Sequence, residues 1–192
     1  SPNGKTIAFV SDKSDEENVW LTPAAGGEAH QLTRMSKMGI GGIQWSPDSK
    51  KIMLADNSTT LWLIDATTGL TEKIAQDEYG APFSFSMSQD SRLITYVKAD
   101  AFNQSSIWIY DTVTKKHTRI TKAPFKDANP VFDRSGEYLY FLGDRNVGMN
   151  WDAFDFQMDA DPPTKIMMVA LTADAVNPFA EKVDEEGADK KP

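Results

Sequence analysis

Trp45-Ser46-Pro47-Asp48-Ser49-Lys50 is the stretch that decides the fold, because versions of it occur four times in the chain. Pro fixes φ, and Asn, Asp and Gly tolerate left-handed backbone, so the stretch is typical of a tight turn between two strands. The copies begin at Ser1, Ser46, Ser88 and Asp133, which gives steps of 45, 42 and 45 residues. Repeats at this period indicate a series of similar structural units.

Two further markers follow each turn in a fixed order. The second marker is an apolar segment that contains a tryptophan in three copies, at Trp20, Trp62 and Trp108. The third marker closes three copies with a short segment such as Gln31-Leu32-Thr33 or Arg119-Ile120-Thr121. Four short antiparallel strands in a repeat of this length are the sequence form of a β-propeller blade.

The strand after each turn is apolar at consecutive positions, as in Ile52-Met53-Leu54-Ala55 and Leu139-Tyr140-Phe141-Leu142. A strand with one face in water would alternate between apolar and polar residues. These strands therefore need cover on both faces, and we expect neighbouring blades to supply it. No helix of three turns with credible caps is expected.

We predict an all-β fold, a partial β-propeller of about four four-stranded antiparallel blades with the first and last incomplete. The predicted repeats are about 1–40, 41–82, 83–127 and 128–171, and together they form the propeller segment 1–171. Residues 172–192 are predicted to form a C-terminal extension and acidic linker. We interpret the chain as a fragment, and the bare edges at both ends predict that it needs the rest of its own chain, or another molecule, for stability.

Copy 4 contains an insertion. The second and third strands start 12, 9 and 13 residues apart in copies 1 to 3, but 27 residues apart in copy 4, from Leu139 to Ile166. About 15 residues are therefore inserted within 143–163, and insertions on rigid scaffolds often carry contacts. The favoured interpretation is that Trp151, Phe154 and Phe156 pack on the blade, and the alternative is a binding segment.

The end of the chain differs in character from the repeats. We expect Asn177-Pro178-Phe179 to dock on the propeller. The charged stretch 184–191 that follows is predicted to be a solvated linker.

Composition excludes some classes of protein. The 192 residues include 20 Lys and Arg against 28 Asp and Glu, and this net charge of -8 argues against binding of nucleic acid. The absence of cysteine excludes disulfides, thiolate metal sites and cysteine nucleophiles, and it favours the cytoplasm. The periplasm is the alternative, because an export signal would not be visible in a fragment. No apolar run approaches the roughly 20 residues of a membrane span.

The sequence predicts no catalytic, cofactor-binding or metal-binding residue. The two histidines, His30 and His117, are expected to be exposed strand residues, and no His-x-x-x-His or Glu-x-x-His pair is present. Gly-x-Ser-x-Gly, the turn that carries the serine nucleophile of α/β-hydrolases, is also missing. No cofactor is expected.

Three other segments have a structural interpretation. Asp12 and Asp144 follow the second strands of copies 1 and 4, and we expect them to accept hydrogen bonds from turn amides. Gly39-Ile40-Gly41-Gly42 is interpreted as a loop that enters a strand, because no helix follows it to complete a phosphate cradle. Asp159-Ala160-Asp161 lacks the remaining ligands of a calcium loop.

The repeat resembles the WD40-like repeat of TolB-type proteins, prolyl-oligopeptidase-type peptidases and tricorn proteases. This resemblance extends over residues 1–171 and implies the fold rather than the function. A more specific resemblance lies in copy 4 and the tail, where Ser135-Gly136-Glu137-Tyr138 is followed by Asp161-Pro162-Pro163, Asn177-Pro178-Phe179 and Asp184-Glu185-Glu186. This order is similar to the late propeller region of tricorn proteases and bacterial tricorn homologues, which precedes their PDZ-like and catalytic domains.

The resemblance implies a non-catalytic propeller segment of a tricorn-like serine protease of the peptidase S41 type. Such a segment would guide or filter peptide substrates towards a separate catalytic domain and would aid assembly. The implied partners are peptides, the remaining domains of the parent protease and further copies in a homo-oligomer. The alternatives are a TolB-type protein-interaction propeller and the propeller of a prolyl-oligopeptidase-type peptidase. No catalytic residue of the family is carried over, because the matching domains are not in this chain.

Overall fold

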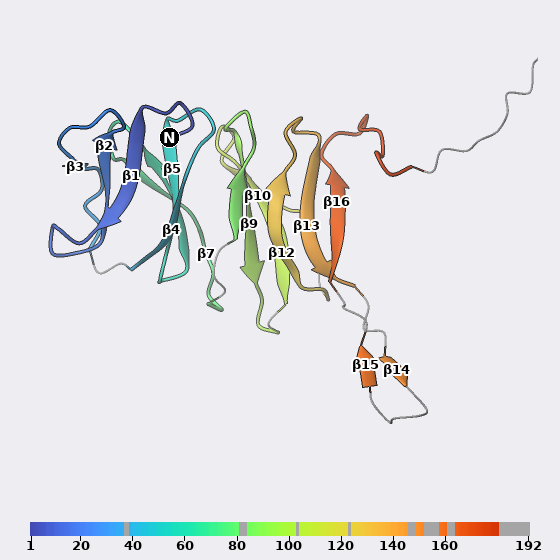
Figure 1. Ribbon diagram of the computed structural model, residues 1–192. Helices are drawn as coiled ribbons and strands as arrows, with labels where there is room; N and C mark the ends of the chain where they lie inside the picture. Colours follow the sequence, from blue (N-terminus) through green and yellow to red (C-terminus); the bar gives the residue numbers. More distant parts are fainter. Residues whose placement is uncertain are drawn as a thin grey trace, which may run out of the picture.

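The computed structural model describes residues 1–36, 39–80, 84–102, 104–122, 124–145, 149–151, 158–160 and 164–180. Every regular element in these ranges is a β-strand. The strands form four antiparallel sheets of three or four strands in a row, and one separate hairpin (Figure 1). The predicted all-β fold of four blades is therefore confirmed, and the row of sheets does not close into a ring.

The first two blades follow the repeat strand by strand. Blade 1 contains β1 (Thr6–Ser11), β2 (Asn18–Pro23) and β3 (His30–Gln31). Blade 2 contains β4 (Ile40–Trp45), β5 (Lys51–Asp56), β6 (Thr60–Asp65) and β7 (Thr71–Gln76). Each strand pairs with the next one in the sequence, so β4 is an edge strand of blade 2 and is followed by the Ser46 turn.

The last two blades repeat this order. Blade 3 contains β8 (Phe85–Met87), β9 (Leu93–Ala99), β10 (Ser105–Asp111) and β11 (Lys116–Arg119). Blade 4 contains β12 (Asp127–Phe132), β13 (Tyr138–Asp144) and β16 (Thr164–Ala170). In the described residues the first and last blades have three strands each, which confirms the prediction that they are incomplete.

The insertion in copy 4 lies between β13 and β16. These two strands pair directly, with Gly143 opposite Lys165. Between them, β14 (Met149–Trp151) and β15 (Met158–Ala160) form a two-stranded hairpin that lies apart from the blades (Figure 1). The predicted packing of Trp151, Phe154 and Phe156 concerns side chains that lie outside the described residues.

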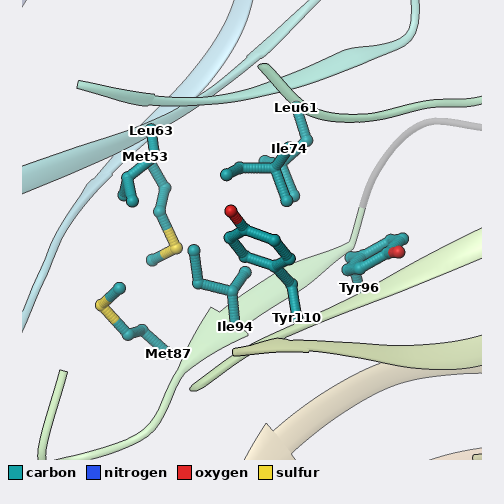
Figure 2. Packing of buried hydrophobic residues seen from close by; sticks show 8 residues of the cluster. All are labelled: Met53, Leu61, Leu63, Ile74, Met87, Ile94, Tyr96 and Tyr110. Atoms are coloured by element: carbon teal, nitrogen blue, oxygen red, sulfur yellow. The ribbon is translucent and has the colours of Figure 1, made fainter. Parts of the chain in front are cut away.

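The hydrophobic core is divided into three clusters, one at each junction between blades. The cluster between blades 1 and 2 is formed by Val19, Leu21, Ile52, Leu54 and Ile64. The next, shown in Figure 2, is formed by Met53, Leu61, Leu63, Ile74, Met87, Ile94, Tyr96 and Tyr110. The third is formed by Val97, Ile107, Ile109, Phe132, Leu139 and Phe141. The buried apolar side chains of each blade therefore pack against a neighbouring blade.

Strand β5 shows why the apolar residues are consecutive. Successive side chains of a strand point to opposite faces of its sheet. Ile52 and Leu54 pack towards blade 1, whereas Met53 packs towards blade 3. All three are 0% exposed, so the prediction that neighbouring blades cover both faces is confirmed.

The segment after β16 contacts blade 4 through its backbone. The hydroxyl of Tyr138 donates a hydrogen bond to the carbonyl of Val176. The Phe179 side chain is 72% exposed, so the expectation that Asn177–Phe179 docks is wrong for the aromatic ring. The Phe179 N–H donates to the Asn177 side chain instead, which closes a local turn. The predicted linker 184–191 lies outside the described residues.

Candidate functional site

In blades 1 to 3 the repeat turn is held by a serine at its first position. In blade 2, the Ser46 hydroxyl donates to Asp48 Oδ1 at 2.6 Å and accepts the N–H of Lys51 at 2.8 Å. Burial works to raise the pKa of Asp48, but the hydrogen bonds from Ser46 and from the Lys50 N–H outweigh it, and the net pKa is lowered. Asp48 therefore stays ionised as the acceptor that orders the turn.

Hydrogen bonds also join the turns of neighbouring blades. The N–H of Asn3 in blade 1 donates to the hydroxyl of Ser49 in blade 2 at 3.1 Å. The N–H of Asp48 in blade 2 donates in the same way to Ser91 in blade 3 at 3.0 Å. Both serines have left-handed backbone, with φ of 62° and 59°. The fourth residue of a turn thus supplies an acceptor to the turn before it.

This series of bonds stops between blades 3 and 4. The fourth residue of the blade 4 turn is Gly136, which has the same left-handed backbone (φ 77°) but no hydroxyl. Asp90, which corresponds to Asp48, has no acceptor for its N–H among the described residues. The two turns instead border a cleft of about 410 Å³.

We call this space the turn cleft, and five of its seven lining residues have polar side chains. Its lining consists of Ser88, Gln89, Asp90, Leu93, Arg134, Ser135 and Gly136. Asp90 and Arg134 bring opposite charges to the two sides, and both residues are exposed. Leu93 is the apolar member of the lining. The cleft can therefore offer hydrogen-bond donors and acceptors with little net charge.

The blade 4 turn also exchanges the positions of its hydroxyl and its carboxylate. Asp133 stands where the other turns have serine, and Ser135 stands where they have Asn or Asp. Ser135 donates to Asp133 Oδ2 at 2.5 Å, and Asp133 Oδ1 accepts the Tyr138 N–H at 3.0 Å. The exchange keeps the turn intact and leaves a hydroxyl, rather than a carboxylate, on the side of the cleft.

A second polar cluster joins β7 of blade 2 to β10 of blade 3 and to the turn that follows β10. Glu72 in β7 accepts a hydrogen bond from the Tyr110 hydroxyl at 2.5 Å and contacts Lys115 Nζ at 2.8 Å. Burial works to raise the pKa of Glu72, but Lys115 and Tyr110 outweigh it and lower the net pKa. The carboxylate is thus used in a contact between blades.

A third polar cluster lies at the base of the insertion. Arg145 Nη1 is 2.7 Å from Asp127 Oδ1, although neither Asp127 oxygen is aligned for a hydrogen bond, so the contact is ionic. The guanidinium also lies 4.4 Å from the centre of the Phe125 ring. Asp127 is fully buried on β12, and such a carboxylate needs a cation nearby. These two contacts fix the Arg145 side chain at the point where the insertion leaves β13.

The histidines singled out in the sequence lie in strands. His30 is in β3 and His117 is in β11, and both residues are exposed. Burial of the ring and the charge of Lys98 lower the pKa of His117, and its Nδ1 lies 2.9 Å from the Tyr96 hydroxyl. The two histidines belong to different blades, and the described residues contain no group of three or more His, Cys, Asp or Glu side chains suited to a metal.

The acidic residues singled out in the sequence differ from expectation. Asp12 accepts a turn amide, from Asp15, through its backbone carbonyl rather than its carboxylate. Asp144 accepts the Thr164 hydroxyl at 2.6 Å, which joins β13 to β16 across the base of the insertion. Asp161, the end of the calcium-like stretch, lies outside the described residues. The glycine segment leads into a strand as predicted, but most of it is strand rather than loop: Gly39 precedes β4, and Ile40, Gly41 and Gly42 lie within β4.

Arg134, Gly136 and Arg145 were not predicted from the sequence as site residues. Arg134 was visible as a departure of copy 4 from the repeat consensus, whereas the glycine at position 136 also occurs in copy 1, as Gly4. The fourth turn residue in the four copies is Gly4, Ser49, Ser91 and Gly136. The change from serine to glycine between copies 3 and 4 is the sequence feature from which the turn cleft could have been predicted. Arg145 carries no sequence signal, because its partner lies on a different strand.

The described residues include no helix long and apolar enough to span a membrane.

Comparison with known proteins gives a consistent result. The profile of the family described as the second β-propeller domain of tricorn protease matches residues 1–192. A tricorn-like protease C-terminal subunit of Sulfurisphaera tokodaii is 30% identical over 99% of this chain and 21% of its own length. Tricorn protease of Thermoplasma volcanium is 28% identical over 90% of this chain and 17% of its own length. The chain thus spans about a fifth of these relatives.

The fold agrees with a solved structure. A crystal structure of tricorn protease superposes with a TM-score of 0.81 at 19% identity, over 91% of this chain and 18% of the other. At this identity the superposition supports the propeller fold.

Proposed function

Because the chain belongs to the tricorn protease family, through its second β-propeller domain, we propose that it is a non-catalytic segment that guides peptide substrates. It directs or filters peptides towards a catalytic domain elsewhere in the parent protein, and it aids assembly of that protein. The proposed parent is a serine protease of the peptidase S41 type. The match to the family profile over the whole chain favours this function over a TolB-type or prolyl-oligopeptidase-type propeller.

The observation that carries the proposal is the arrangement of the first strand of each blade. β4, β8 and β12 are each the edge strand of a sheet, so their outer backbone groups are not used within the blade. β12 also packs beside β8, so the edges of blades 3 and 4 follow one another. Gly42, Gln44 and Val131 on these strands are exposed. Such a row of edges offers an extended peptide repeated backbone contacts.

The proposal also divides the chain into two parts. We propose that residues 1–171 act as one propeller segment and that 172–192 connect it to the next part of the parent. The proposed partners are peptides, the remaining domains and further copies of the parent. The cytoplasm is the proposed compartment, which the lack of cysteine supports.

A peptidase assay tests the non-catalytic part of the proposal. The purified chain, shown by circular dichroism to retain β-structure, should not hydrolyse a mixture of unstructured peptides, whereas the intact parent should. Activity that remains with the chain through successive purification steps, at a constant ratio to protein, would contradict it.

A further inference from the structure

The turn cleft lies at the junction of blades 3 and 4. The hydrogen bond that joins neighbouring turns at the two earlier junctions is missing there, and the cleft takes its place. At the two preceding junctions a serine hydroxyl accepts the N–H of the next turn, at 3.1 and 3.0 Å. At the third junction the corresponding donor, the Asp90 N–H, has no acceptor among the described residues, and Asp90 and Gly136 both line a cleft of about 410 Å³. The cleft therefore combines an available backbone donor with room for another molecule.

We propose that the turn cleft binds the backbone of an extended peptide. A peptide carbonyl accepts the Asp90 N–H in place of the missing serine hydroxyl. The inference rests on the proposed function, because peptides are the ligands that the propeller is proposed to guide. It adds a defined contact point on the propeller itself.

The lining explains why a peptide backbone fits better than a charged group. A peptide unit is neutral and carries one donor and one acceptor. Asp90 on one side and Arg134 on the other would each repel one sign of ligand charge, so neither sign is favoured. The volume lies in the range of roughly 300–1,000 Å³ found for ligand sites.

The position of the cleft suits contact with a peptide that follows the edge strands. Ser88 comes directly after β8, and Asp133 comes directly after β12. The cleft thus lies where the edge strands of blades 3 and 4 end. A peptide that runs along these edges reaches the cleft without crossing a blade.

Two substitutions at Gly136 distinguish the effect of restoring the hydrogen bond from the effect of filling the space. Gly136→Ser supplies the hydroxyl that Ser49 and Ser91 supply at the other junctions, and those serines tolerate the same left-handed backbone. Gly136→Ala introduces the same backbone strain, and its Cβ would meet no atom within 4 Å, but it provides no acceptor. The alanine variant is therefore the matched control.

The experiment is photo-cross-linking in the intact parent protein. The probe is a capped, uncharged peptide of serine and alanine with one central photo-leucine, and the linked residues are mapped by mass spectrometry. We expect links to 88–93 and 134–137, a yield about tenfold lower in Gly136→Ser, and a yield within about twofold of wild type in Gly136→Ala. A yield unchanged by the serine variant, or lowered equally by both variants, would overturn the proposal.

A second arm tests the chemical group that is bound. The same peptide with a free carboxylate at its C-terminus should cross-link as the capped peptide does. Links that require the free carboxylate would contradict recognition of the backbone. If cross-linking fails at the cleft while the propeller still controls access of long peptides, the cleft is wrong and the proposed function stands.

Discussion

The backbone N–H of Asp48 donates to the hydroxyl of Ser91 at 3.0 Å, and this bond joins the turn of blade 2 to the turn of blade 3. The same relationship between Asn3 and Ser49 joins blade 1 to blade 2. Blades 1, 2 and 3 are thus connected by polar contacts at one end of their strands, in addition to the apolar clusters between the sheets. A hydrogen bond of this kind contributes about 1 kcal/mol to stability.

Ser91→Ala should therefore lower the free energy of unfolding by about 1 kcal/mol, because the Asp48 N–H loses its acceptor. Hydrogen–deuterium exchange should quicken at the turn 46–51 in the intact parent protein. Ser58→Ala is the control, since Ser58 is exposed and its hydroxyl has no partner in the described part of the chain. Equal exchange at this turn in wild type and Ser91→Ala would show that the bond does not hold the blades together.

Substitutions at Asp133 and Ser135 should compensate for each other, because these two residues have exchanged the positions of the carboxylate and the hydroxyl. Asp133→Ser alone replaces the carboxylate that accepts from both the Ser135 hydroxyl and the Tyr138 N–H with a single hydroxyl, and Ser135→Asp alone places two carboxylates together. The double variant recreates the Ser-x-Asp order of the other turns and should recover most of the loss. Urea unfolding of the four proteins should give a coupling energy of about 1–2 kcal/mol. Additive effects would mean that the two residues act independently.

Gly143→Ala should be strongly destabilising for a strand position. Its Cβ would lie 2.7 Å from Arg145 Nη1 and 2.7 Å from Asp127 Oδ1, so one or both side chains must shift, and we expect the ion pair to separate. Separating the pair leaves a buried carboxylate without its cation, which we expect to cost about 2–4 kcal/mol.

Gly42→Ala on β4 is the matched control for this change. A Cβ at Gly42 would meet no atom within 4 Å, and a small change in stability is expected. Thermal unfolding of the two variants compares them directly. A similar effect at both positions would contradict the role of Gly143 in making room for the ion pair.

The pH dependence of stability should include a contribution from Asp111. Arg92 contacts this carboxylate through two nitrogens, at 2.7 and 3.2 Å, and the hydrogen bond holds the pKa of Asp111 well below its ordinary value. A lowered pKa stabilises the fold above the ordinary pKa of 3.8, and this stabilisation is lost as pH falls towards the folded value.

Asp111→Asn should therefore be less stable than wild type near neutral pH, and the difference should shrink as pH falls from about 4 to about 2. Urea unfolding at a series of pH values measures the effect. Asn keeps an oxygen that can accept the Val113 N–H, so the turn itself is retained. A difference that stays constant over this pH range would contradict the assignment.

The sequence predicted the blades well because their signals are local and repeated. The turn, the tryptophan strand and the consecutive apolar residues of β5 each depend on neighbours within one copy. The contacts between copies could not be predicted in the same way, because the repeat does not define which residues meet across a junction. Gly136 was visible as a departure from Ser49 and Ser91, but its meaning depends on the distant N–H of Asp90. The pairing of Asp127 with Arg145 likewise depends on how β12 and β13 align.

The proposed guidance of peptides is tested most directly by blocking the edge strands. Gln44→Cys lies on the exposed face of β4, and Thr118→Cys lies on the exposed outer strand β11 as a control. Each is coupled to polyethylene glycol in a parent protein without other reactive cysteines. The measurement is the rate of cleavage of a long peptide divided by that of a short chromogenic substrate. We predict that the ratio falls for the Gln44 conjugate and is unchanged for the Thr118 conjugate; equal ratios for both conjugates and the unlabelled protein would contradict the proposed function.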